Sequence, residues 1–250
     1  MLTLKDFQRE EQPNWCPTCG NFGIILSVKK ALMELNVPQE ETVLVSGVGC
    51  FAKLPYWIKA YGFVGLHGRS LPVAQGVKLA NSKLKVIAFG GDGDGYGEGG
   101  NHFIHACRRN VNIAYFVHNN GVFGLTTGQY SPTSKKGTKS KSSPSGSEEM
   151  PVNPLALAIA SGAKFVARAY SGDPKGLVEI MKKAIEYEGF AFVDIMQSCI
   201  TFGKEHDYFK DKIYHLDDSY DASDKVKAMG KALDYEETER FALGIIYQEL

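Results

Sequence analysis

Hydrophobic positions alternate along the chain between helical spacing and short continuous runs. Residues 22–35 carry Ile25, Val28 and Leu32 on one helix face, and residues 42–48 form a β-branched run that ends in glycines. This pattern predicts a helix followed by a buried strand.

The same alternation continues through most of the sequence. It predicts further helices at residues 71–81, 101–109, 154–161, 174–188 and 223–235, further strands at residues 85–89, 112–118, 163–169 and 190–196, and an apolar segment at residues 241–247. Near-continuous apolar strands separated by helices indicate an α/β fold, in which a mostly parallel sheet is covered by helices on both faces.

One segment interrupts the alternation. Residues 131–149 are rich in Ser, Lys, Gly and Pro and have almost no apolar side chains, so they bury too little surface to offset their ordering entropy. We therefore predict a mobile loop. Because the α/β pattern resumes afterwards, we interpret residues 1–250 as a single domain with this loop and a C-terminal tail at 207–250, not as two domains joined by a linker.

Ligands of open parallel sheets bind beyond the carboxyl ends of the strands. Three glycine-rich loops follow predicted strands there: residues 46–50 (SGVGC), 90–95 (GGDGDG) and 119–124 (NNGVFG). Glycines allow the backbone to come close to a phosphate group. We expect the chemistry of the protein at these three loops.

Two of these loops carry oxygen ligands suited to Mg²⁺. Asp92 directly follows one strand, Asn120 follows the next, and strands one crossover apart are usually neighbours. A carboxylate would repel a bare phosphate, so a bridging cation is required, and carboxylate and amide oxygens suit octahedral Mg²⁺. The pair predicts a site for magnesium and a diphosphate, to which the following helix would add backbone N–H groups.

Four of the five cysteines lie in segments that can meet at one sheet edge. Cys16 and Cys19 form a Cys-x₂-Cys pair, while Cys50 and Cys199 each follow a predicted strand. Four such thiolates suit either a tetrahedral metal ion or a [4Fe–4S] cluster, and the presence of only one close pair favours the cluster. Cys107 lies within a predicted helix, where packing is the expected role.

Composition and charge narrow the class of protein. The 250 residues include 28 Lys and Arg and 28 Asp and Glu, so the chain lacks the cationic surplus of proteins that coat nucleic acid or anionic membranes. No apolar run approaches the roughly 20 residues that span a bilayer, and the polar N-terminus has no signal-peptide layout. We expect a cytoplasmic protein, in which an odd cysteine count argues against a disulfide framework.

Six motifs taken together resemble one family. They are WCPTCG at residues 15–20, SGVGC at 46–50, LHGR at 66–69, GDGD at 91–94, RRN at 108–110 and GLTTGQYSPT at 124–133. The chain resembles, over its whole length, the β subunit of 2-oxoacid:ferredoxin oxidoreductases, and the interval from Gly-Asp-Gly to Asn-Asn resembles the thiamine diphosphate motif. The resemblance implies the thiamine diphosphate-binding fold.

The resemblance also implies a set of site residues. Thiamine diphosphate would be bound by Gly47, Cys50, His67, Gly68, Arg69, Gly91, Asp92, Gly93, Asp94, Asn120, Val122, Gly124, Leu125 and Thr126. Asp92, Asn120 and the carbonyl of Val122 would hold Mg²⁺, and Cys16, Cys19, Cys50 and Cys199 would hold a [4Fe–4S] cluster. His67 is a candidate catalytic residue by this resemblance. Lys53, three residues after Cys50, is a second candidate as a partner of the substrate carboxylate, and a solvated surface lysine is the alternative interpretation.

The implied reaction is oxidative decarboxylation of a 2-oxo acid to acyl-coenzyme A and CO₂, with electrons passed to ferredoxin. An α subunit would complete the active site, so we expect this chain alone to be inactive. The sequence departs from the family pattern at Thr18, Phe123, Ser198 and Gly203. The departures around Cys199 make it the least secure cluster ligand.

Two other functions fit parts of the sequence. A non-oxidative thiamine diphosphate decarboxylase or synthase needs the Gly-Asp-Gly to Asn-Asn motif but no cluster cysteines, and a non-catalytic metal or electron-transfer module needs only the cysteines. Lys135, Lys136, Lys139 and Lys141 in the predicted loop suggest recruitment of acidic coenzyme A or ferredoxin. A plain solvated loop is the alternative.

Overall fold

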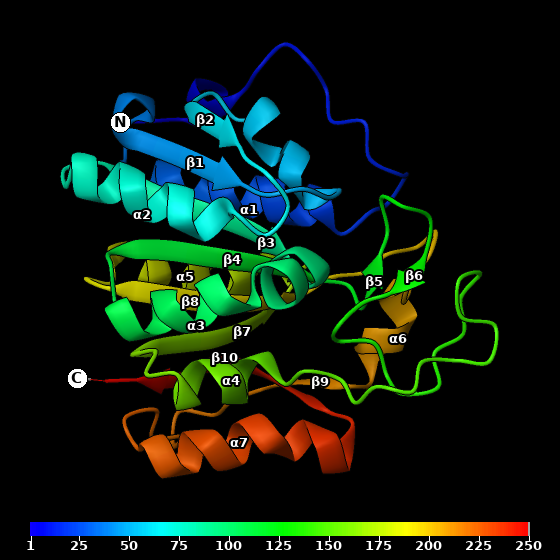
Figure 1. The fold of residues 1–250 in the computed structure, drawn as a ribbon. Coiled ribbons are helices and arrows are strands. Elements are labelled where there is room, and N and C mark those ends of the chain that lie inside the picture. The colour runs from blue at the N-terminus through cyan, green and yellow to red at the C-terminus, as the bar shows by residue number, and fades with distance from the viewer. Residues whose placement is uncertain (250) are drawn as a thin grey trace.

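An eight-stranded sheet runs through the molecule (Figure 1). The computed structural model describes residues 1–249, so residue 250 of the predicted tail lies outside the described residues. The strands are β1 (Thr42–Ser46), β2 (Tyr61–Val64), β3 (Lys85–Gly91), β4 (Ile113–Asn119), β7 (Phe165–Tyr170), β8 (Phe190–Met196), β9 (Ile213–His215) and β10 (Phe241–Gln248). Their order is β2-β1-β3-β4-β8-β7-β10-β9, and every pair is parallel except β7 with β10.

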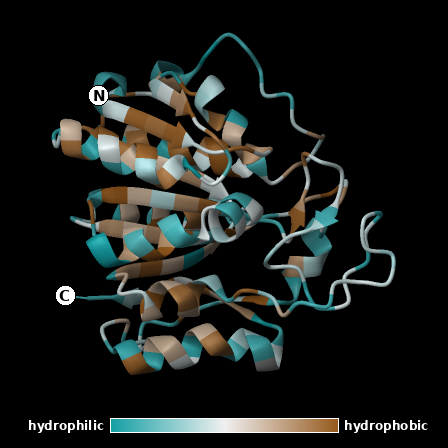
Figure 2. Cartoon of the chain, viewed as in Figure 1, coloured by the Kyte–Doolittle hydropathy of each residue, from teal (hydrophilic) through white to brown (hydrophobic). Residues whose placement is uncertain are grey.

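Helices cover both faces of this sheet. The helices are α1 (Asn21–Glu34), α2 (Ser70–Ala80), α3 (Gly100–Arg109), α4 (Pro154–Ala160), α5 (Pro174–Glu186), α6 (His206–Lys210) and α7 (Lys225–Thr238). One core lies between the sheet and α1 with α5, and a second lies between the sheet and α2, α3, α4 and α7. Figure 2 shows hydrophobic residues along the strands and a mixture of hydrophobic and hydrophilic residues along helices such as α3 and α7. The predicted α/β fold is confirmed.

The predicted helices and long strands are confirmed, with ends shifted by a few residues. Local signals explain two of the helix starts. The side chains of Asn153 and Asp173 accept hydrogen bonds from Ala156 N (3.2 Å) and Gly176 N (3.1 Å), and a proline follows each of these caps.

The shorter elements were not predicted from the sequence. Strand β2 lies at the sheet edge with Tyr61 and Phe63 exposed, so it carries no buried alternation. The pair β5 (Val122–Phe123) and β6 (Gln129–Tyr130), together with α6 and β9, are too short to show a period. A π-helical turn, Gly93–Glu98, leads from the Gly-Asp-Gly loop towards α3.

The predicted loop at 131–149 is hydrogen bonded to the rest of the molecule at its N-terminal end, where Ser131 donates to Asp92 and Ser134 to the Gly121 carbonyl, whereas Ser147 bonds to residues of the loop itself. Ser131, Ser134 and Ser147 are buried, and Lys135 pairs with Glu239, while Lys136, Lys139 and Lys141 are exposed. Ser131 and Ser134 thus find hydrogen-bond partners outside the segment, which composition does not reveal, and the mobility of the rest of the segment stays a prediction.

The predicted C-terminal tail is part of the sheet. Strand β10 lies between β7 and β9, and α7 packs against α4 and β10. Within residues 1–249, no helix has the length and apolar character needed to cross a membrane.

Candidate active site

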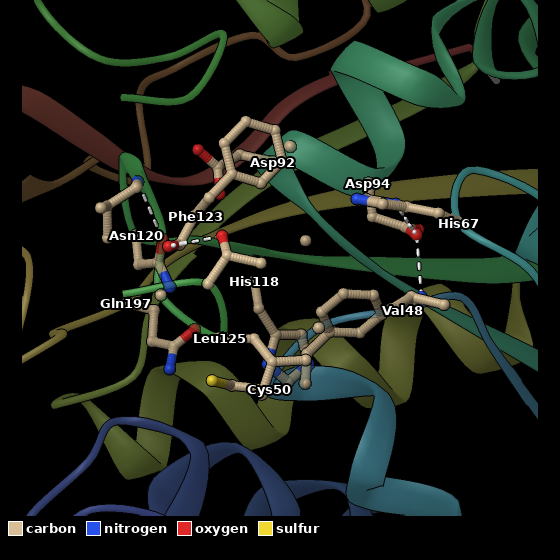
Figure 3. Close-up of a pocket in the computed structure, with 17 residues that line it drawn as sticks. Val48, Cys50, His67, Asp92, Asp94, His118, Asn120, Phe123, Leu125 and Gln197 are labelled. Atoms are coloured by element: carbon tan, nitrogen blue, oxygen red, sulfur yellow. Dashed lines mark hydrogen bonds and ion pairs between the residues drawn. The ribbon is translucent and has the colours of Figure 1, made fainter. Parts of the chain in front are cut away.

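The carboxyl ends of β1, β3, β4 and β8 meet at one edge of the sheet, where their loops enclose a cavity. We call it the central cavity, and Figure 3 shows the 17 residues that line it. Of the predicted site residues it brings together Cys50, His67, Gly91, Asp92, Gly93, Asp94, Asn120, Val122, Gly124, Leu125 and Thr126. Strands β3 and β4 are neighbours, as predicted.

Asp92 is a dehydrated carboxylate on the cavity wall. It is 2% exposed, and its Oδ2 accepts hydrogen bonds from the hydroxyls of Ser131 and Thr133, the latter at 2.7 Å. Burial raises the pKa of Asp92, although the two hydroxyl hydrogen bonds oppose the shift. A cation at this position would favour the charged form.

Asn120 and Val122 complete the expected oxygen set. The Asn120 Oδ1 accepts a hydrogen bond from Val122 N at 3.0 Å, which folds the turn after β4 so that both residues face the cavity. One carboxylate, one amide and one peptide carbonyl are hard oxygen ligands, and Mg²⁺ prefers such ligands. These three residues could hold the ion.

Asp94 fastens three loops to one another. Its Oδ1 lies 2.9 Å from Val48 N, 2.8 Å from Gly68 N and 2.9 Å from His67 Nδ1, and Figure 3 shows the carboxylate between His67 and Val48. A Cβ at Gly47 would lie 2.2 Å from the same oxygen, so position 47 requires glycine. The hydrogen bond that His67 Nδ1 donates to Asp94 raises the pKa of His67.

Gly47 and Gly68 therefore do not line the central cavity, but they allow the loops that form its wall to pack closely together. Gly68 has a positive φ of 71°, and a Cβ there would lie 2.6 Å from the backbone of Glu98 and Gly99. Gly93 packs against the ring of Phe123, which a Cβ at 93 would approach to 2.1 Å. These contacts explain three glycines of the predicted set.

Two further predicted residues, besides Gly47 and Gly68, do not line the central cavity. Arg69 is exposed, and its Nη1 lies 2.6 Å from His102 Nε2. Lys53 donates to Asn14 Oδ1 at 3.2 Å and lines the neighbouring cysteine cavity. Neither side chain faces Asp92 in this arrangement.

Four cysteines line a second, adjoining cavity. This cysteine cavity contains Cys16, Cys19, Cys50 and Cys199, as the sequence predicted. Burial raises the pKa of both Cys19 and Cys50. Cys107 is fully buried on α3, away from this cavity, and burial raises its pKa to about 12, which confirms a packing role.

The segments that carry Cys19 and Cys199 are clamped together by His206. Its Nε2 lies 3.0 Å from the Thr18 carbonyl and its Nδ1 lies 3.0 Å from Ser198 Oγ, while Gly20 N donates to the Ser198 carbonyl at 3.2 Å. His206 thus contacts both Thr18 and Ser198, two of the residues that depart from the family pattern.

Gly203 stands where the family commonly has Asn. A Cβ at Gly203 would lie 2.9 Å from the Cys199 Cβ, so in this chain the turn after Cys199 requires glycine. The departure leaves the Cys199 side chain in the cysteine cavity.

The two cavities share one wall. Its residues line both cavities and are Cys50, Asn120, Gly124, Leu125 and Gln197. Gln197 Nε2 donates to Cys19 Sγ at 3.6 Å. A Cβ at Gly124 would lie 3.7 Å from Cys199 Sγ and 3.9 Å from Cys50 Sγ. The cavities are therefore separated by little more than single side chains.

Several contacting residues were not predicted from sequence. Ser131 and Thr133 lay in the segment interpreted as a mobile loop, although their hydroxyls were a signal for hydrogen bonding to a nearby carboxylate. Gln197, which precedes the Ser198–Cys199 pair, carried no signal beyond its place after a strand.

Comparison with known proteins identifies the family. Residues 47–195 match the family described as "Thiamine pyrophosphate enzyme, C-terminal TPP binding domain", and residues 199–250 match the family of the C-terminal part of the pyruvate ferredoxin oxidoreductase beta subunit. The 2-oxoacid:ferredoxin oxidoreductase subunit beta of Saccharolobus solfataricus is 47% identical over 253 residues, covering 95% of this chain and 82% of that protein. The chain belongs to the β subunits of the 2-oxoacid:ferredoxin oxidoreductases.

Other relatives of this β subunit agree. The 2-oxoglutarate synthase subunit KorB of Methanocaldococcus jannaschii is 36% identical, with 94% of this chain and 93% of that protein covered. The structure of a 2-oxoglutarate:ferredoxin oxidoreductase from Magnetococcus marinus, with 2-oxoglutarate, coenzyme A and succinyl-CoA bound, superimposes with a TM-score of 0.96 at 39% identity, covering 100% of this chain and 86% of that chain. The family resemblance and fold class are confirmed, and this β subunit is one part of a multi-subunit enzyme.

Proposed function

We propose that this β subunit holds thiamine diphosphate and Mg²⁺ in the central cavity and a [4Fe–4S] cluster in the cysteine cavity. With an α subunit it would convert a 2-oxo acid and coenzyme A to acyl-coenzyme A and CO₂, passing electrons singly to ferredoxin. The observation that carries this proposal is the shared wall between a cavity with magnesium-type ligands and a cavity with four thiols.

The ligand chemistry of the central cavity fits a magnesium diphosphate. Burial raises the pKa of Asp92, and Mg²⁺ would offset that by stabilising the charged carboxylate, while Asn120 and the Val122 carbonyl complete the protein ligands. The remaining glycine-loop residues of the predicted set, with His67, would contact the cofactor. Arg69, directed towards His102, would need a different rotamer to reach it.

The cysteine cavity fits a cluster better than a single zinc ion. Structural zinc sites usually take two close pairs of ligands, whereas here only Cys16 and Cys19 are close in sequence. A zinc ion with Zn–S bonds of about 2.3 Å needs its sulfurs close together, whereas a cluster spreads its ligands over several metal atoms. The raised pKa of Cys19 and Cys50 means that metal binding must release their protons.

When bound, thiamine diphosphate supplies a nucleophilic carbon that adds to the substrate carbonyl and accepts the electron pair left by CO₂, and the cluster supplies a one-electron acceptor. This chain contributes position and charge. His67, held by Asp94, presents a protonatable ring at the cavity mouth, and Lys53 at the rim of the cysteine cavity would attract the substrate carboxylate. Gln197 would donate a hydrogen bond to the cluster ligand Cys19.

The central cavity of this chain is too small to enclose the cofactor alone. It holds about 90 Å³, whereas ligand pockets usually hold roughly 300 to 1,000 Å³. This supports a site completed by the α subunit, which would also supply the carboxylate that activates the cofactor's aminopyrimidine ring. Much of the side-chain pocket for the 2-oxo acid would then lie on that subunit.

The test is anaerobic co-expression with the α subunit, followed by assay of CO₂ release and acyl-coenzyme A formation from a panel of 2-oxo acids with ferredoxin. We expect ferredoxin reduction by the pair and none by the β subunit alone. Activity of the single chain would refute the shared active site.

The same preparation distinguishes the proposed function from the two alternative functions. Absence of iron and sulfide, with CO₂ release that needs neither coenzyme A nor ferredoxin, would favour a non-oxidative decarboxylase. Iron without any binding of thiamine diphosphate and Mg²⁺ would favour an electron-transfer module.

A further inference from the structure

A third cavity lies beside the turn after β4. This lateral cavity has a volume of about 380 Å³, which is within the usual range for a ligand pocket. Among the described residues, Asn120 alone lines both this and the central cavity. The predicted cofactor contacts therefore leave the lateral cavity without a role.

A buried arginine with a fixed orientation lies on its wall. Arg168 is 4% exposed, its Nε donates to Asp194 Oδ2 at 3.3 Å, and its guanidinium lies 5.4 Å from the ring centroid of Phe241. Asp194 is in turn held by Tyr96 Oη at 2.9 Å and by Asn119 Nδ2 at 3.0 Å. Among the side chains that the structure describes, which do not include that of Glu237, the two terminal Nη groups of Arg168 have no hydrogen-bond acceptor, so both donors remain available to the cavity.

A lysine on the same wall, unlike Arg168, has no anionic partner among the described side chains. No carboxylate of the described chain lies within ion-pair distance of Lys204, whose Nζ lies 4.6 Å from the Tyr208 ring centroid. Burial, followed by the nearby Lys135 and Lys212 ammonium groups, lowers the pKa of Lys204 to about 8. Lys135 and Lys212 differ from it, because both pair with Glu239.

The acidic residues of the wall do not neutralise these two cations. Glu239 is held by its two lysines, and Glu236 accepts from Asn153 Nδ2 at 3.0 Å. Apolar side chains form much of the remaining lining: Met150, Met196, Phe209, Tyr235 and Phe241. Lys204 has no carboxylate partner among the described side chains, and Arg168 keeps two donors beyond its pair with Asp194. Both lie beside an apolar wall, which favours a ligand that has one anionic end.

We propose that the lateral cavity binds an organic oxyanion, a carboxylate or a phosphate attached to an apolar body. The Nη groups of Arg168 and the Lys204 ammonium hold the oxygens, and the aromatic and methionine side chains contact the apolar body. Asp194 fixes the guanidinium before the ligand arrives, so little side-chain entropy is lost on binding.

The test uses the complex of this β subunit with its α subunit, saturated with thiamine diphosphate and Mg²⁺ so that the central cavity is filled. Phenyl phosphate and benzoate are titrated separately by calorimetry. We expect one site per β subunit for at least one probe, and the tighter probe identifies the preferred oxyanion. Lys204→Met should weaken binding about tenfold, the loss of one charge-assisted contact.

Lys210→Met is the matched control, because Lys210 is exposed and does not line the cavity. Arg168→Lys, with its folding checked by thermal unfolding, should also weaken binding, since lysine lacks the guanidinium fork. Three results would overturn the proposal: no binding of either probe, equal binding by the Lys204 and Lys210 variants, or binding only when thiamine diphosphate is absent. Cofactor binding is measured in the same samples, so failure of the proposed function is recognised separately.

Discussion

Gln197 gives the sharpest test of how the two cavities act together. Its side chain is 2% exposed, its backbone N donates to the Asn119 carbonyl at 2.9 Å, and its Nε2 donates to Cys19 Sγ at 3.6 Å. A Cβ at Gly20 would lie 2.7 Å from its Cγ, so the amide packs closely against the cysteine loop. Gln197→Leu keeps the volume and removes the donor.

The expected effect is a lower reduction potential of the proposed cluster. A hydrogen bond to a charged group contributes about 1.5–3 kcal/mol, and it stabilises the reduced cluster more because that state carries one more negative charge. If about 1 kcal/mol of this depends on the redox state, the potential falls by about 40 mV, since 59 mV is a tenfold change for one electron. Redox titration followed by electron paramagnetic resonance measures the shift.

Gln75→Leu is the control, because Gln75 is also buried but donates within α2, to the Leu71 carbonyl. Iron and sulfide content should be equal in both variants and the parent protein. An unchanged potential in Gln197→Leu, a rise, or an equal shift in Gln75→Leu would show that the amide does not act on the cluster.

Three further predictions concern the central cavity. Because burial raises the pKa of Asp92 above its unfolded value of about 3.9, the folded apo-protein binds that proton more tightly, and its stability should fall as pH rises through the folded pKa. Asp92→Asn should remove that fall in urea unfolding at several pH values, together with Mg²⁺-dependent cofactor binding; an unchanged pH profile would contradict this. The pKa of His67 is raised by Asp94, so its stabilising contribution should be complete below about pH 6.5 and lost as pH rises through the folded pKa. NMR titration should show that pKa falling in Asp94→Asn, and no change would contradict the pairing. Gly47→Ala places a Cβ 2.2 Å from Asp94 Oδ1 and should cost about 1–3 kcal/mol of stability, whereas Gly76→Ala, with open space around it in α2, should stabilise by about 0.5–1 kcal/mol; equal unfolding midpoints would refute the steric argument.

The long buried strands and the residues at their ends could be predicted from the sequence. The apolar runs of β3, β4 and β8 are buried along their whole length, so each predicted its own strand. Parallel order then placed Asp92 and Asn120 at one edge without any knowledge of side-chain packing. Cys50 and Cys199 meet for the same reason, because they follow β1 and β8, whereas Cys16 and Cys19 precede α1, which begins beside the Ser198 carbonyl.

The remainder depends on partners far apart in the sequence. The hydroxyls of Ser131 and Thr133 meet Asp92 about forty positions earlier, which composition alone cannot reveal. The antiparallel insertion of β10 next to β7 is a long-range pairing with no local signature. Arg168 lies within a predicted strand, and its pairing with Asp194 of the neighbouring strand follows only from their register.

The single oxygen of Asp94 shared by Val48, His67 and Gly68 has a consequence for how this family can change. The loops that carry Val48, His67 and Asp94 meet at this one oxygen atom, so none of them can shift alone. A substitution in one loop therefore changes which substitutions the other two tolerate. Pairs of substitutions across these loops should therefore show strong epistasis in double-mutant cycles. Variation among β subunits is expected to accumulate elsewhere first, on surfaces such as the edge strand β2.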